Sequence, residues 1–213
     1  MRKKRIMLFM AAVMLASVIG IFAAGSSVEA KTKNVTSKYK KSVQKTLRAH
    51  DEYLGYGCDS KIAFKFDNYA RSTMLCFAKG EYWGKSLKQL KAEYKSQWKK
   101  TFTAKFAFKM KKHKGDRWAG TPRPWSNPSY LIQLVDGKAE YLGGDWGDVG
   151  PRGYVKKIQQ NGKSYVVTYQ IKWFDYVENK STGTMGSYKI TLKKSGSRWK
   201  IRNIKRLSAK AGV

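Results

Sequence analysis

The sequence is poor in the residues that most often carry catalysis. Among its 213 residues there are two histidines, two cysteines and 14 acidic residues. His50 stands beside Asp51 and His113 lies in a lysine run, and neither belongs to a metalloprotease, nucleophile-elbow or Cys–His motif. Neither cysteine has a second cysteine or a histidine at metal-ligand spacing. We therefore expect no catalytic residue, no metal and no cofactor, and the sequence favours a binding module over an enzyme.

Negative charge is scarce, because 44 lysines and arginines stand against the 14 acidic residues and give a formal net charge of +30. Self-repulsion at this charge lowers folding stability, so solubility alone explains it poorly. Outside a cell the abundant polyanions are wall polymers, acidic polysaccharides, released nucleic acid and lipid headgroups. The charge therefore predicts an anionic partner, and the alternative is a solvated basic surface with no dedicated partner.

Long apolar runs are absent except at the N-terminus. Basic residues at 2–5 precede an uncharged run at 6–24, and small or modest side chains at 28–30 offer a cleavage site before Lys31. This is the three-part layout of a secretory signal peptide. The alternative is an uncleaved anchor helix, since a run of 19 residues can just span a bilayer.

We expect residues 1–30 to be removed and residues 31–213 to form a single basic domain, ordered from about 35 to 207. Removal takes away four basic residues and one acid, which leaves 40 against 13 and a net charge of +27. No later stretch is apolar enough for an integral membrane span. The mature chain is therefore expected to be secreted and extracellular, or associated with the cell envelope.

The two cysteines, Cys58 and Cys76, form an even pair in a chain that is expected to be exported. In an oxidising compartment such a pair predicts one disulfide. The chain-entropy model gives a loop of this size about 3 kcal/mol of stabilisation. Two buried free thiols are the alternative.

Helical periodicity dominates the first half of the mature chain. Ser86 and Gln89 form a capping-box pair, and Asp67 is a predicted cap of an earlier helix. The predicted helices are residues 39–54, ended by Gly55 and Gly57; residues 68–78, ended by Gly80; and a helix with the apolar stripe Leu87, Leu90, Tyr94, Trp98 and Phe102.

Alternating apolar residues predict strands elsewhere. Short strands are predicted at 62–66 and 104–110, and a loop at 111–128. From residue 130 onward the pattern predicts an antiparallel meander of about five to six strands. Its turns are Asp136-Gly137, Asn161-Gly162 and Ser195-Gly196-Ser197. The fold class is therefore α+β, with N-terminal helices packed on a curved antiparallel sheet.

Two late segments, Tyr-Lys-Ile-Thr-Leu at 188–192 and Trp-Lys-Ile at 199–201, combine aromatic residues with isoleucine, and Tyr-Trp-Gly-Lys-Ser stands at 82–86. With the leading helices, this layout resembles the nuclear transport factor two-like, cystatin-related α+β roll and small exported bacterial proteins of that layout, over most of residues 35–207. The family contains enzymes, ligand-binding cones and interaction domains, so the resemblance implies a fold and no function. Its enzymes usually place an Asp/His or Asp/Arg pair inside the cone, and no position here matches such a pair.

One glycine-rich loop, residues 143–150, contains Asp145, Trp146 and Asp148. Its two carboxylates could bind Ca²⁺ or form an acid/base pair beside a tryptophan that packs on sugar. The loop lacks the EF-hand order of ligands, and its simplest interpretation is a turn in which Asp caps and Gly permits positive φ. We treat it as a candidate ligand loop, together with Trp118 and Trp125.

Basic residues occupy the outward positions of the capping-box helix and of the last two strands. Like charges on neighbouring strands repel, and without nearby counter-charges only an external anion relieves them. A solvated face is the alternative. The predicted polyanion-binding residues are Lys88, Lys91, Lys95, Lys99, Lys189, Lys193, Arg198, Lys200 and Arg202, and Lys205, Arg206 and Lys210 extend the same surface.

Two functional hypotheses follow. The first is a secreted, non-catalytic module that binds an anionic polymer or surface, with wall polymer, acidic polysaccharide, nucleic acid and lipid headgroups as the partner classes. The second is a small-ligand or carbohydrate-binding or carbohydrate-active cone domain that uses the loop around Asp145, Trp146 and Asp148. A lined cavity beneath that loop favours the second hypothesis, and a filled core favours the first.

Overall fold

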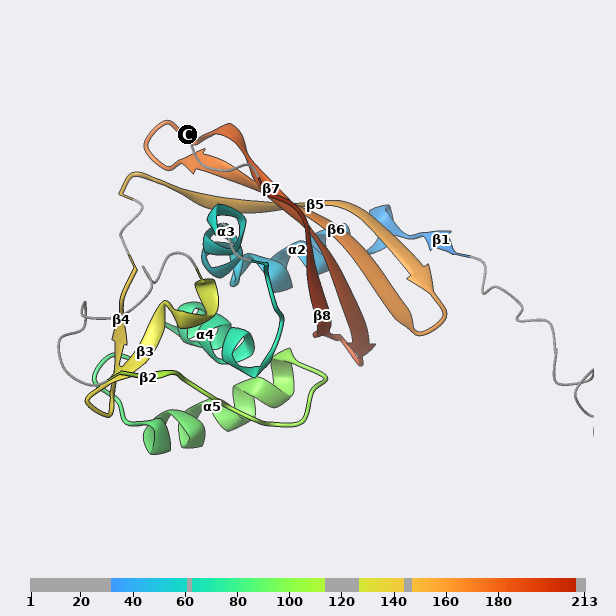
Figure 1. The fold of residues 1–213 in the computed structure, drawn as a ribbon. Helices are drawn as coiled ribbons and strands as arrows, with labels where there is room; N and C mark the ends of the chain where they lie inside the picture. Colours follow the sequence, from blue (N-terminus) through green and yellow to red (C-terminus); the bar gives the residue numbers. More distant parts are fainter. Residues whose placement is uncertain (1–31, 61–62, 114–126, 144–146, 210–213) are drawn as a thin grey trace, which may run out of the picture. The chain divides into compact units, whose positions relative to one another are not determined.

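The helices come first in the chain and the long strands last, as the sequence predicts (Figure 1). The computed structural model describes residues 32–60, 63–113, 127–143 and 147–209. The helices are α2 (Thr36–Arg48), α3 (Asp51–Asp59), α4 (Asn68–Lys79) and α5 (Leu87–Thr101), and a 3₁₀ turn spans Pro128–Tyr130. The strands are β1 (Lys33–Asn34), β2 (Lys112–His113), β3 (Ile132–Val135), β4 (Lys138–Tyr141), β5 (Val149–Asn161), β6 (Ser164–Asp175), β7 (Lys180–Ser195) and β8 (Arg198–Ala209). The fold class is α+β, as predicted.

The larger sheet has the strand order β1-β5-β6-β7-β8, and all its pairs are antiparallel. Val167, Tyr169 and Ile171 of β6 are fully buried, so alternate residues of this strand form the core face of the sheet. The register of β5 against β6 shifts between Val155 and Lys157, and similar shifts interrupt the other long pairs. Bulges of this kind increase local twist and bend, which explains the curvature of the sheet.

The predicted single meander is in fact two sheets, because β3 and β4 pair with β2 in a separate sheet of order β2-β3-β4. Asp136 (φ 46°) and Gly137 (φ 83°) form the turn between β3 and β4, as predicted. Positive φ at both positions matches the primed hairpin turns. Asn161 still belongs to β5, so the next turn begins one residue later than predicted, at Gly162.

The caps of α4 and α5 confirm the sequence signals. The side chain of Asp67 accepts a hydrogen bond from the backbone N–H of Ala70 at 2.9 Å, and Gly80 ends α4 with a φ of 73°. Ser86 and Gln89 form the reciprocal capping box at the start of α5. Each device satisfies backbone groups that a helix end leaves without a partner.

The predicted first helix is two helices, because the chain breaks at His50 between α2 and α3. The sequence predicts that Gly55 and Gly57 end the first helix, but both residues lie inside α3. A Cβ at Gly57 would collide with the hydroxyl of Tyr188, and one at Gly55 would collide with the ring of Pro151. The two glycines therefore allow α3 to approach β5 and β7 closely.

The strands predicted at 62–66 and 104–110 are wrong for the residues described there, 63–66 and 104–110, which join no sheet. Their aromatic side chains nevertheless pack on the core, and Phe108 is 2% exposed. Phe64 packs its ring edge against Tyr188. The alternation therefore reflects alternate burial along extended chain, without strand pairing.

The predicted disulfide does not form, because Cys58 and Cys76 are both buried free cysteines. Cys58 faces β7, beside Gly186 and the hydroxyl of Tyr188, whereas Cys76 faces α5, beside the hydroxyl of Tyr94. Burial raises the pKa of the Cys58 thiol to about 11 and that of Cys76 to about 12. Both thiols are therefore protonated and unreactive at neutral pH.

One hydrophobic cluster joins the helices to both sheets, with contributions such as Val43 of α2, Trp98 of α5, Leu134 of β3 and Ile190 of β7. Within the described part of the chain, no helix is long and apolar enough to cross a membrane. The predicted signal peptide, residues 1–30, lies outside the described residues, and its cleavage stays a prediction.

Candidate anion-binding surface

The apolar residues of α5 pack on the core, so its lysines lie on the outward side of the helix. Leu90, Tyr94 and Trp98 are fully buried, and the indole N–H of Trp98 donates to the carbonyl of Ala104 at 3.0 Å. This fixes the rotation of the helix about its axis. The predicted basic face is exposed and consists of Lys88, Lys91, Lys95 and Lys99.

The last two strands place lysines directly opposite each other. Lys193 of β7 pairs with Lys200 of β8, and Lys189 pairs with Lys205. These side chains point away from the core because Trp199, next to Lys200, is buried on the other face. Arg198 and Arg202, the other predicted cations of β8, are exposed. Directly opposed like charges destabilise a strand pair.

No acidic side chain in the described ranges neutralises this surface. The ion pairs there are Lys79–Glu81, Lys85–Glu93 and Lys180–Glu178. None of them includes a predicted polyanion-binding residue. The repulsion between β7 and β8 is therefore not relieved by any described carboxylate, which is the condition under which an external anion is expected to bind.

The end of α5 is joined to β8, so the two basic groups meet. Phe102 follows the last turn of α5 and forms a parallel bridge with Ile201. The backbone N–H of Thr103 donates to the carbonyl of Ile201 at 3.1 Å. Trp98 packs edge-on against Phe102 and holds this connection against the core.

A pocket of about 470 Å³ lies at the junction, and we call it the hairpin pocket. It brings Lys99 of α5 together with Arg198 and Lys200 of β8. The sequence predicts these three residues as members of two separate basic groups, and the fold makes them neighbours. The hairpin pocket is lined by Ser96, Lys99, Lys100, Ser195, Gly196, Ser197, Arg198 and Lys200.

The lining of the hairpin pocket suits a phosphate, sulfate or carboxylate group. Each lysine offers three N–H donors, the guanidinium of Arg198 offers five, and the serine hydroxyls can also donate. Hydrogen bonds from charged donors to an oxyanion are among the stronger ones in proteins. Lys99 and Lys100 lie in the last turn of α5, where the helix dipole favours cations. Sequence reasoning missed Lys100 and the serines, because only the contact between α5 and β8 makes them a site.

Two cations that the sequence adds to this surface do not belong to it as described. The guanidinium of Arg206 donates to the backbone carbonyls of Gly57 at 2.6 Å and Ser60 at 2.7 Å. Arg206 therefore satisfies carbonyls at the C-terminal end of α3 and is not free to bind an anion. Lys210 lies outside the described residues.

The candidate ligand loop is only partly visible. Asp148 is exposed, and its backbone carbonyl accepts a hydrogen bond from the N–H of Tyr176 at 2.9 Å. Among the described residues, no group of three or more His, Cys, Asp or Glu side chains could hold a metal ion. The remaining members of the predicted loop lie outside the described residues, namely Trp118, Trp125, Asp145 and Trp146. Gly147 and Gly150 of this loop line a pocket of about 600 Å³ that is described below, so the loop has a cavity beside it, and the second hypothesis stays a prediction.

Comparison of the chain with protein-family models, with curated protein sequences and with solved structures gives no match. The surface is therefore interpreted from its own geometry and charge.

Proposed function

We propose that the mature chain is a secreted, non-catalytic module that binds an anionic polymer at the cell envelope or outside the cell. The observation that supports this most strongly is the hairpin pocket, where Lys99 of α5 lies beside Arg198 and Lys200 of β8. These cations have no acidic partner among the described residues. A polymer that carries one negative charge per repeat would supply the missing counter-charges.

We expect the anionic polymer to bind through many weak contacts and one preferred site. The hairpin pocket would hold one anionic group, and the exposed lysines of α5 and of β7 and β8 would bind neighbouring groups along the chain. Lysine is a compact charge on a flexible stem, so such contacts tolerate varied geometry. We therefore expect selectivity for charge density and little selectivity for monomer sequence.

We also propose that the fold is a nuclear transport factor two-like roll. The support is the order of the elements, in which α2 to α5 precede the long strands, and the curvature of the antiparallel sheet. This assignment carries no functional consequence, because folds of this kind host unrelated activities.

A salt series tests the proposed function. The mature chain is mixed with an acidic polysaccharide, a phosphate-rich wall polymer, DNA or anionic lipid vesicles, and the binding constant is measured at increasing salt. We expect the logarithm of the binding constant to fall linearly with the logarithm of salt concentration, because bound counterions are released. Absence of binding to all four at about 50 mM salt, where such contacts are strong, would refute the proposal.

A further inference from the structure

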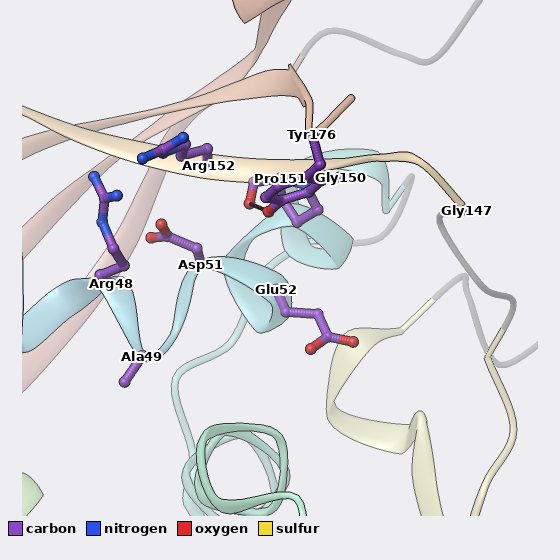
Figure 2. A pocket seen from close by; sticks show the side chains of 9 residues that line it. All are labelled: Arg48, Ala49, Asp51, Glu52, Gly147, Gly150, Pro151, Arg152 and Tyr176. Atoms are coloured by element: carbon purple, nitrogen blue, oxygen red, sulfur yellow. Dashed lines mark hydrogen bonds between the residues drawn. The ribbon is translucent and has the colours of Figure 1, made fainter. Parts of the chain in front are cut away.

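A second pocket, of about 600 Å³, lies where α2 meets α3 beside the start of β5. Figure 2 shows Arg48, Asp51 and Glu52 on the helical side and Arg152 and Tyr176 on the side of the sheet. We call it the Arg48 pocket. Its size falls in the range of small-molecule sites, which is about 300–1,000 Å³.

The aromatic wall of this pocket is fixed in place by the backbone of β5. The ring of Tyr176 lies against Gly150, where an added Cβ would stand 3.0 Å from Cε2 of the ring. The hydroxyl of Tyr176 donates to the carbonyl of Pro151 at 3.4 Å, and its N–H donates to the carbonyl of Asp148 at 2.9 Å. The side chain is still 57% exposed, so part of the held ring surface is available for contact.

The carboxylate of Asp51 belongs to the framework of the pocket. One of its oxygens accepts a hydrogen bond from the hydroxyl of Tyr169 at 2.5 Å, and the other accepts one from the N–H of Gly153 at 2.8 Å. Asp51 is 6% exposed. It therefore ties the start of α3 to β5 and β6, and its oxygens are already engaged within the protein.

The guanidinium N–H groups of Arg48 and Arg152, in contrast, remain available as hydrogen-bond donors. Figure 2 shows the guanidinium groups of Arg48 and Arg152 extending to the same side as the Asp51 carboxylate. Arg152 lies over the ring of Phe174, 3.9 Å from its centre, which restricts its motion. Within the described part of the chain, neither arginine forms an ion pair or a side-chain hydrogen bond, and the Asp51 carboxylate attracts both without contacting them directly. Two guanidinium groups in one pocket therefore offer unused donors in the planar arrangement that oxyanions accept.

The acidic residues of the pocket limit the charge of its ligand. The Asp51 carboxylate lies on the same side of the pocket as the two guanidinium groups, whereas Glu52 extends to the other side (Figure 2), so a ligand with a second negative charge beside the arginines would meet Asp51. A carboxylate such as that of Glu52 can accept hydrogen bonds from hydroxyl groups. The lining therefore favours a ligand with one negative charge, several hydroxyl donors and an apolar ring face for Tyr176.

We propose that the Arg48 pocket binds a sugar acid of monosaccharide size, with its carboxylate between Arg48 and Arg152 and its ring against Tyr176. A hexuronate has one carboxylate, several hydroxyl groups and a C–H face that packs on aromatic rings. A neutral hexose leaves both guanidinium groups without an acceptor. A hexose phosphate brings a second charge toward Asp51. This site is separate from the hairpin pocket and does not depend on the proposed function.

Titration of the mature chain with sodium glucuronate, followed by calorimetry or by NMR chemical shifts at physiological salt, tests the proposal. We expect a dissociation constant in the millimolar range, and binding of glucose and of glucose 6-phosphate at least tenfold weaker. Arg48→Gln and Arg152→Gln should each weaken glucuronate binding at least tenfold, because each removes a charged donor. Lys41→Gln, at an exposed position of α2 outside both pockets, should leave it unchanged.

Three results overturn the proposal. The first is no glucuronate binding at concentrations well above the millimolar range. The second is equal or tighter binding of glucose or of glucose 6-phosphate, since either excludes recognition of a singly charged sugar acid. The third is unchanged glucuronate affinity in both arginine variants, with the fold of each confirmed by circular dichroism.

Discussion

Two adjacent residues, His50 and Asp51, carry opposite pKa changes with one cause. His50 is 4% exposed, and burial lowers its pKa from 6.5 to about 4. Burial raises the pKa of Asp51 from 3.8 to about 6, although its bonds to Tyr169 and Gly153 act in the opposite direction. In both cases the low-polarity surroundings disfavour the charged form.

The two residues should make opposite contributions to acid stability. As pH falls from 6.5 to about 4, the unfolded chain takes up a proton at His50 that the folded chain does not, which costs about 3 kcal/mol. Over nearly the same range the folded chain takes up a proton at Asp51 that the unfolded chain does not, which stabilises by about 3 kcal/mol. The two contributions largely cancel in the wild type.

Removing either group should reveal the pH dependence of stability that the other group contributes. Relative to the wild type, His50→Asn should gain stability as pH falls from about 6.5 to about 4, and Asp51→Asn should lose it. Urea unfolding of the three proteins across this pH range measures the difference. Parallel curves for all three would show that neither group is titrated in the way its burial implies.

At the scale of elements, the close packing of α3 on the sheet depends on Gly57. Gly57→Ala places a methyl group against the hydroxyl of Tyr188, which donates to the carbonyl of Leu54 at 2.8 Å. Alanine favours a helix by about 1 kcal/mol over glycine. Overpacking costs about 1–3 kcal/mol, so we expect net destabilisation.

A double-mutant cycle with Tyr188→Phe tests this contact by urea unfolding. Removing the hydroxyl removes the obstacle, so the double variant should be more stable than the sum of the two single changes implies. Strict additivity would contradict a direct clash. Stabilisation by Gly57→Ala alone would show that helix propensity outweighs the packing at this position.

The opposed lysines of β7 and β8 make a second prediction at this scale. Lys200→Glu creates an opposite-charge pair with Lys193, and we expect stabilisation of about 0.2–1 kcal/mol at low salt. The same change should weaken polymer binding, because it reverses a charge in the hairpin pocket. Lys193→Glu in the Lys200→Glu background restores like charges and should cancel the gain in unfolding free energy. A loss of stability in the single variant would mean that the opposed lysines do not repel.

How far sequence reasoning reaches depends on whether a signal is local. The capping box at Ser86 and the turn at Asp136-Gly137 are local hydrogen-bond and backbone preferences, and the structure keeps both. The predicted end of the first helix at Gly55 is wrong. Glycine at this position leaves room for the ring of Pro151, which is far away in the sequence. The predicted pairing of Cys58 with Cys76 is wrong for the same reason, since each thiol faces a different distant element.

At the scale of the whole chain, the net charge of +30 predicts an anionic partner but does not say where it binds. The basic residues of α5 and of the last two strands were predicted from periodicity, because outward positions follow from the apolar stripes. Their meeting at the hairpin pocket depends on the bridge between Phe102 and Ile201, which no local pattern reveals. The Arg48 pocket was missed for the same reason, since Arg48 and Arg152 come from α2 and β5.

The central claim is that local geometry, and not net charge alone, binds the polymer. Two double variants that remove the same charge separate these explanations. Lys99→Gln with Lys200→Gln changes the hairpin pocket, whereas Lys41→Gln with Lys45→Gln changes exposed lysines on α2. Both are compared with the wild type by measuring polymer binding across a salt series.

We predict that the first double variant loses affinity and flattens the salt slope by about two units, roughly one for each lost contact. The second should change the slope by less than half as much. Equal losses in the two variants would contradict the account, because binding would then follow total charge and the hairpin pocket would have no special role.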